Sequence, residues 1–350
     1  MRILSLVFGM LLMFPFMAQA KDYRPPDDTL IALSKPQQEE SALARRLFHF
    51  SIAPSVGLMR GHATYQIGGH VDDPTGSYDI WFPLSELIFP LNVTMGGMDF
   101  TVTYDQVWRL KTELRKNITS SAGNMKDSDW GIPWENPPGS GTYYWYGPDS
   151  LDIYSESTTE LDAFVLDVDV MGKFAQTTLQ SAVISFHGGL GYRYQDYNFK
   201  CSLIQQWDNR EGAPPSEKMD YIGDGSVALT YDVTTKIPYA KIASTLAMNN
   251  VFNIEASVGY SPFVRVQDKD NHLLSSKLSF GDCDGTAVLL SLNGRLDVLH
   301  PVFFEMAADY ISIDTKGKQT QCTNGSWSGT LDQKYFSTVN SLELLVGYKF

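Results

Sequence analysis

Over most of the chain, apolar and polar residues alternate in stretches of about ten residues. In one stretch, apolar Phe252, Ile254, Ala256, Val258 and Tyr260 alternate with polar or small residues. Side chains of an extended strand point to its two faces in turn, so one face can meet lipid while the other lines a polar lumen. This alternation, repeated along the chain, is typical of a transmembrane β-barrel.

Two kinds of connection separate these stretches. Candidate tight turns contain Gly, Asn or Pro, which suit a sharp bend: Met95-Gly96-Gly97-Met98, Met171-Gly172-Lys173, Asn249-Asn250 and His300-Pro301. Candidate long loops are polar and lie at about 68–77, 116–158, 201–224, 271–286 and 316–335. Short turns on one side and long loops on the other match the periplasmic and extracellular ends of an outer-membrane barrel. We therefore predict an all-β fold, a closed antiparallel transmembrane barrel of about ten strands.

Pro262 interrupts the alternation just before Asp268, Asp270 and His272. If the alternation continued unbroken, these three side chains would face lipid. Proline within a strand often marks a β-bulge, and a bulge reverses the facing of the residues that follow. We therefore expect a one-residue irregularity between positions 261 and 263.

The first 44 residues lack this alternation. A charged start at Arg2, a short apolar run and the ending Ala18-Gln19-Ala20 predict a secretory signal peptide over residues 1–20. Residues 21–44 are polar and contain several prolines, which predicts an irregular N-terminal arm before a barrel over 45–350. No later segment approaches the roughly 18 consecutive apolar residues that a membrane helix needs.

Charge and cysteine content narrow the possibilities further. The formal net charge of −13 disfavours nucleic acid as a partner, because phosphate contacts need clustered Lys and Arg. Three cysteines allow at most one internal disulfide in an exported protein. We favour a Cys283–Cys322 bond, since both residues fall in polar segments assigned to the same side of the membrane; the alternative is three free thiols.

Two acidic motifs are candidates for chemistry. Asp127 and Asp129 share one face of an extended segment, as do Asp268, Asp270 and His272, and both sets lie where a strand gives way to a predicted extracellular loop. An acid can orient the imidazole while the imidazole takes a proton from water, and a facing acid pair can hold that water. Either Asp pair alone is more often a solvated turn former. An acidic rim can also bind calcium, but no full calcium-loop pattern is present, so no metal is predicted.

These motifs resemble those of the omptins, ten-stranded outer-membrane endopeptidases of Gram-negative bacteria. The resemblance rests on Gly123-Asn124-Met125-x-Asp127-x-Asp129-Trp130, Tyr260-Ser261-x-x-Val264 and Asp268-x-Asp270-x-His272. It implies that Asp127 and Asp129 form the acid pair, that Asp270 and His272 form the dyad, and that the nucleophilic water lies between His272 and Asp127 without a covalent intermediate. It also implies polypeptide substrates, a site facing the cell exterior and contact with outer-membrane lipid; we expect a monomer.

Two departures from the omptin pattern affect specificity and cofactors. Omptins prefer to cut between basic residues, and Asp268 matches an acid of the pocket for the residue before the cut. Tyr65 replaces a second acid, so it lines the same predicted pocket and weakens its charge. Omptins also need lipopolysaccharide, but Asp196 and Thr234 stand where arginines are expected, so this lipid site is altered or absent. No other cofactor is predicted.

A non-catalytic barrel is the alternative function. Acidic extracellular loops could serve an adhesin or attract cations to a pore. Conductance in planar bilayers without cleavage of a peptide library would favour this alternative. Loss of cleavage on His272→Ala, with the barrel still folded, would favour the endopeptidase.

Overall fold

The computed structural model describes residues 47–350 apart from 145–146, 148, 181 and 250. The predicted signal peptide and N-terminal arm lie outside the described residues. Among the residues described, no helix is long and apolar enough to cross a membrane.

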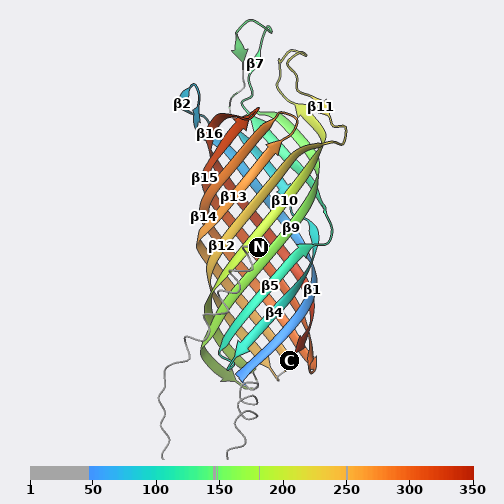
Figure 1. The fold of residues 1–350 in the computed structure, drawn as a ribbon, viewed down its shortest axis with the longest axis vertical. Coiled ribbons are helices and arrows are strands. Elements are labelled where there is room, and N and C mark those ends of the chain that lie inside the picture. The colour runs from blue at the N-terminus through green and yellow to red at the C-terminus, as the bar shows by residue number, and fades with distance from the viewer. Residues whose placement is uncertain (1–46, 145–146, 148, 181, 250) are drawn as a thin grey trace, which may run out of the picture. The chain divides into compact units, whose positions relative to one another are not determined.

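The described residues from Phe48 onward form a closed antiparallel barrel (Figure 1). Its long strands are β1 (Phe48–Asp73), β9 (Leu151–Leu179), β10 (Ala182–Asp208), β12 (Val227–Met248), β13 (Phe252–His272), β14 (Lys277–Leu299), β15 (Val302–Thr323) and β16 (Ser326–Lys349). Two composite strands join β3 (Ser85–Pro90) to β4 (Val93–Tyr104) and β5 (Trp108–Asn117) to β6 (Ser121–Trp130). Eight long and two composite strands close the ring through the β1–β16 pair. The predicted ten-stranded barrel is therefore confirmed.

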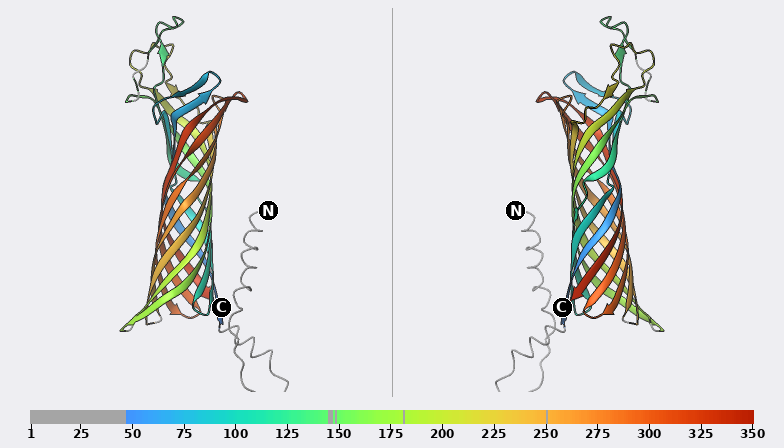
Figure 2. Two further views of the ribbon diagram at one scale, coloured as in Figure 1. Left: turned by 90° about the vertical axis from the view of Figure 1, so that its left-hand side faces the viewer. Right: turned by 90° about the vertical axis from the view of Figure 1, so that its right-hand side faces the viewer.

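The composite strands give the barrel different neighbours at its two ends. At one end the ring runs through β1, β4, β5 and β9, and at the other through β1, β3, β6 and β9. The second end, called the rim below, also carries the short strands β2 (Gly76–Asp79), β7 (Trp134–Glu135), β8 (Tyr143–Tyr144) and β11 (Tyr221–Ile222). The connections with β7 and β11 rise beyond the rim in Figures 1 and 2.

The predicted alternation of β13 is confirmed. Ala256, Val258 and Tyr260 are exposed, whereas Ser257 and Gly259 between them are buried. Four other long strands also expose large apolar side chains on the outer wall, among them Leu290, Leu292, Leu342, Leu344, Leu190 and Ile242. An apolar outer wall of this extent fits a lipid-facing band.

One of the four predicted turns is confirmed, because His300-Pro301 separates β14 from β15. In the predicted turn Asn249-Asn250, Asn249 follows β12 with a φ of 52°, and residue 250 lies outside the described residues. The prediction for 95–98 was wrong: the chain continues as β4 and turns at Asp105 and Gln106, which have φ values of 51° and 54°.

The predicted turn at 171–173 was also wrong, because these residues lie within β9 and the turn follows at Gln180, with a φ of 54°. The glycines of both segments serve packing. A Cβ at Gly97 would collide with the backbone of Leu114, and one at Gly172 would press on the ring of Trp108. Close approach between strands requires glycine as often as a turn does.

Several predicted long loops are strand instead. The connection between β13 and β14 is only residues 273–276, and that between β15 and β16 is Asn324 and Gly325. These segments are polar because the strands extend beyond the membrane into water. There the two strands of each hairpin still pair with each other through backbone hydrogen bonds. Long connections remain after β6 and after β10.

The predicted Cys283–Cys322 disulfide was wrong, since Cys201, Cys283 and Cys322 are all free thiols. Cys283 lies opposite Gly317 on β15, five residues before Cys322. Five residues of strand span roughly 17 Å, whereas a disulfide needs Cα atoms about 4 to 7 Å apart. The structure therefore agrees with the alternative prediction of three free thiols.

Candidate active site

The predicted bulge in β13 is present and turns the acidic motif inward. The β13–β14 register shifts between Ser261 and Val264, and both Pro262 and Phe263 face outward. Beyond the shift, Asp268 and Asp270 are buried in the barrel. The outward positions here are polar, as at Lys269, so this part of β13 lies beyond the lipid-facing band.

The acid pair reaches the rim on β6, between β3 and β9. Asp127 lies opposite Leu87 and Asp129 opposite Ser85 in the β3–β6 register. Met125, two residues before Asp127, is buried in the core, which places the same face of β6 inward. Both aspartates are half-buried, and the Oδ1 atom of Asp127 is buried without a hydrogen-bond partner among the described residues.

Asp270 and His272 form a hydrogen-bonded pair. Nε2 of His272 lies 2.8 Å from Oδ2 of Asp270. The His272 side chain retains 26% of its exposure and that of Asp270 only 2%. The pair therefore extends from the buried interior to solvent. With Nε2–H donated to the carboxylate, Nδ1 is the nitrogen that can accept a proton.

The two motifs interact electrostatically across the rim. Burial, followed by the negative charges of Asp129 and Asp270, raises the pKa of Asp127 well above its usual value. Burial also raises the pKa of Asp129, against the opposing influence of Lys277 and His272. Folding thus brings all four predicted catalytic residues into one electrostatic cluster, in which the acid pair tends to retain a proton.

Asp268 lies deeper than the dyad. Its Oδ2 accepts a hydrogen bond of 2.6 Å from Nε2 of Gln333, while Oδ1 is buried without a partner among the described residues. A Cβ at Gly281, opposite Asp268 on β14, would collide with both side chains. Burial raises the pKa of Asp268 to about 7. The carboxyl group is therefore close to its midpoint of ionisation at neutral pH.

Tyr65 lies beneath the dyad and is only 2% exposed. Its hydroxyl donates a hydrogen bond to Oδ2 of Asp270, the same oxygen that faces His272. Its ring belongs to an aromatic layer across the barrel interior, made of Tyr65, Phe89, Phe199 and Tyr231, with neighbouring ring centroids 4.5 to 6.2 Å apart. The predicted contact of Tyr65 with substrate stays a prediction; the structure adds a contact with the dyad.

Sequence reasoning missed the partners that hold the acids. Gln333 on β16 and the hydroxyl of Tyr65 on β1 both bond to acids of β13. The only sequence signal for Gln333 and Tyr65 is that each occupies an inward-facing position of an alternating strand. Their acid partners follow from the register of the closed sheet, which no local pattern specifies.

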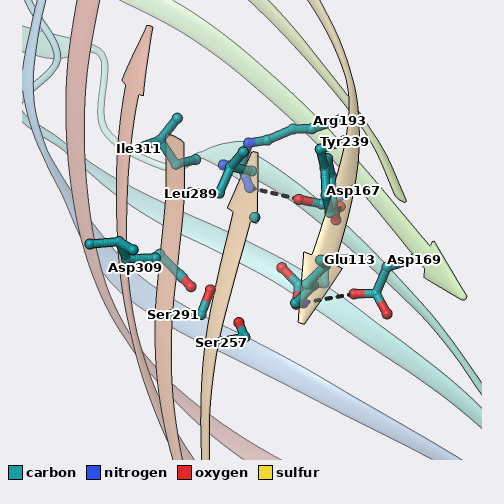
Figure 3. A pocket seen from close by; sticks show the side chains of 13 residues that line it. Glu113, Asp167, Asp169, Arg193, Tyr239, Ser257, Leu289, Ser291, Asp309 and Ile311 are labelled. Carbon is teal, nitrogen blue, oxygen red and sulfur yellow. Dashed lines mark hydrogen bonds and ion pairs between the residues drawn. The ribbon is translucent and has the colours of Figure 1, made fainter. Parts of the chain in front are cut away.

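Charged side chains line the lumen at the level of the lipid-facing band. Figure 3 shows a pocket among these side chains, where Arg193 pairs with Asp167 at 3.0 Å. In the same luminal charge network, Lys241 pairs with Asp169 at 3.0 Å. Arg115 bonds to Glu343 at 2.7 Å in the same interior. The aromatic layer lies between this network and the rim, so buried aromatic rings separate the candidate site from the network.

A sequence model of the Omptin family matches residues 49–326 of the chain. This match covers both candidate motifs and most of the barrel. A search of curated protein sequences found no match.

One solved structure shows the same architecture. The crystal structure of the outer membrane protease OmpT from Escherichia coli superposes with a TM-score of 0.63 at 15% identity, covering 86% of this chain and 97% of that one. At this identity the likeness shows the fold alone. OprG from Pseudomonas aeruginosa matches with a TM-score of 0.39 at 11% identity, covering 87% of this chain and 96% of OprG.

Proposed function

Because the chain belongs to the omptin family, we propose that it is an outer-membrane endopeptidase that uses Asp127, Asp129, Asp270 and His272 to hydrolyse peptide bonds with water. The observation that carries this proposal is the Asp270–His272 hydrogen bond, formed at the rim within the electrostatic reach of Asp127 and Asp129. As an omptin barrel, the chain lies in the outer membrane with this rim on the extracellular side.

In the proposed reaction, Asp270 fixes the imidazole of His272 and stabilises its protonated form. Nδ1 of His272 takes a proton as the water oxygen attacks the peptide carbonyl carbon. The imidazolium returns this proton to the leaving amine when the C–N bond breaks. One water is consumed, and a carboxylic acid and an amine are released without a covalent intermediate.

Asp127 and Asp129 have a different role in this proposal. Their raised pKa values favour a pair that retains one proton more readily than two isolated aspartates would. A carboxyl group in this state can donate a hydrogen bond as well as accept one. The unpartnered Oδ1 of Asp127 is suited to hold the attacking water opposite His272.

Asp268 is the proposed contact for a basic side chain before the cut. Its unpartnered Oδ1 can accept a hydrogen bond from a guanidinium or ammonium group. Tyr65, adjacent to this position, supplies no second negative charge at neutral pH, because burial and Asp270 raise the pKa of its phenol well above its usual value. We expect a preference for basic residues that is weaker than two acids would give.

The alternative of an open pore finds no support in the interior. The aromatic layer and the luminal charge network both cross the lumen, and side chains such as Arg115 and Glu343 pair with each other there. A lumen crossed by paired side chains and packed aromatic rings fits a barrel that works at its rim.

His272→Ala tests the proposal. The refolded variant should lose at least about a hundredfold in cleavage of a diverse peptide library, because the general base is gone, while keeping the heat-modifiable gel mobility of the folded barrel. His70→Ala is the matched control, since His70 is another histidine near the rim and its Nδ1 lies 2.8 Å from Asp79. Wild-type cleavage rates in His272→Ala would refute the proposed mechanism.

A further inference from the structure

The carboxylate of Asp270 is held from two sides. Its Oδ2 accepts one hydrogen bond from the Tyr65 hydroxyl on β1 and faces Nε2 of His272 on its own strand. Its Oδ1 is buried without a partner among the described residues. The phenol and the imidazole therefore share one oxygen, and any change at one of them alters the charge available to the other.

The position of the Tyr65 hydroxyl is set by packing. The ring lies 5.2 Å from that of Tyr231 and 6.2 Å from that of Phe89, and the strand register places it opposite Leu87 and Tyr335. A buried phenol needs a hydrogen-bond partner, and Asp270 provides it. The phenol is thus a fixed donor aimed at the carboxylate.

We propose that Tyr65 is a positioning residue of the dyad: it orients Asp270 towards His272 and withdraws negative charge from the oxygen that the two groups share. This role rests on the proposed hydrolysis, and it is separate from any contact of Tyr65 with substrate. A carboxylate that already accepts a phenol hydrogen stabilises an imidazolium less strongly. The imidazole then remains neutral, and able to accept a proton, at lower pH.

Other ionisable groups also surround the dyad. They are Asp268 on β13, Asp127 and Asp129 on β6, Tyr231 on β12, Lys277 on β14 and Cys201 on β10. All of them are unchanged in a Tyr65→Phe variant, which removes one hydroxyl and leaves the ring in the aromatic layer. The variant therefore isolates the effect of the phenol on Asp270.

The test is the pH profile of kcat/KM for a cleaved peptide, measured on refolded wild type and Tyr65→Phe. In the variant the acidic limb should move upward by about half a pH unit or more, because the imidazolium gains the full charge of Asp270. Looser orientation should lower kcat at the plateau roughly tenfold with little change in KM. If Tyr65 had only a structural role, Tyr65→Phe would lower activity without moving the acidic limb of the pH profile.

Tyr197→Phe is the matched control. Tyr197 is also a buried tyrosine of the barrel interior, 1% exposed, but its hydroxyl points to Sδ of Met59. Its profile should coincide with that of wild type. An unmoved limb in Tyr65→Phe, or the same shift in Tyr197→Phe, would overturn the inference.

A second measurement covers the case in which Tyr65→Phe does not fold. Difluorotyrosine at position 65 keeps the shape of the side chain and donates a stronger hydrogen bond, so the acidic limb should move to lower pH. A shift upward or no shift would contradict the inference. Failure of the proposed function looks different, because wild type would then cleave no peptide or His272→Ala would cleave as wild type does.

Discussion

The side-chain amide of Gln333 on β16 donates a hydrogen bond of 2.6 Å to Oδ2 of Asp268 on β13. This bond crosses the barrel interior and fixes one oxygen of the carboxyl group, while the other has no partner among the described residues. Burial raises the pKa of Asp268 to about 7 even with this bond. The charge of the Asp268 carboxyl group below the dyad therefore depends on the pH of the medium.

The preference for a basic residue before the cut should rise with pH. A carboxyl group with a pKa near 7 is mostly neutral below that pH and mostly ionised above it, so it attracts a guanidinium only on the alkaline side. The ratio of kcat/KM for an arginine peptide to that for a matched norleucine peptide should increase up to about tenfold between about pH 6 and about pH 8.

Two variants control this measurement. Asp268→Asn should make the ratio independent of pH, whereas Asp282→Asn should leave its rise unchanged, because Asp282 is exposed and pairs with Arg265. An unchanged rise in Asp268→Asn would exclude Asp268 as its source.

Deletion of Phe263 should preserve cleavage. Pro262 and Phe263 both face outward, and the β13–β14 register shows that β13 has one extra residue here. Without the extra residue the strand alternates unbroken, so Asp268 and Asp270 keep their inward facing.

Deletion of Lys269 is the contrasting variant: it makes Asp268 and Asp270 adjacent in the strand, so that their side chains face opposite sides, and cleavage should be lost when Asp270 turns outward. Peptide cleavage by refolded barrels with heat-modifiable gel mobility measures both. Full activity after deletion of Lys269 would contradict the required inward facing.

Arg115→Ala should destabilise the barrel far more than Lys116→Ala. Arg115 is 7% exposed and bridges Asp99 and Glu343. Asp99 keeps its ion pair with Lys111, but the loss of Arg115 leaves the buried Glu343 without a cation and costs about 3 to 5 kcal/mol. Lys116 pairs with Asp162 in an exposed bridge worth at most about 1 kcal/mol. Urea unfolding of the refolded barrels in detergent measures the difference. Equal unfolding midpoints would contradict a structural role for the luminal charge network.

Added lipopolysaccharide should stimulate cleavage little. At the positions where arginines were expected, Oγ1 of Thr234 donates a hydrogen bond of 3.2 Å to Asp196, so a carboxylate stands where lipid phosphates would need a base. The double variant Asp196→Arg with Thr234→Arg should gain stimulation. Strong activation of the wild-type barrel, measured with and without the lipid, would instead indicate another lipid site.

The order of polar and apolar residues by itself determined the barrel, the shared face of Asp127 and Asp129, and the need for a reversal at Pro262. These features follow from the direction of each side chain along a strand, which is a local property with a period of two. A sequence shows such a property directly.

Only the tertiary structure decided where strands end and which residues meet between them. Gly97 and Gly172 look like turn residues but permit close strand packing, and that depends on a neighbouring strand. Tyr65 and Asp270 are separated by 205 positions, and Asp268 and Gln333 by 65. Such pairs meet only when the ring closes in one register, and register is a property of the whole sheet that alternation leaves open.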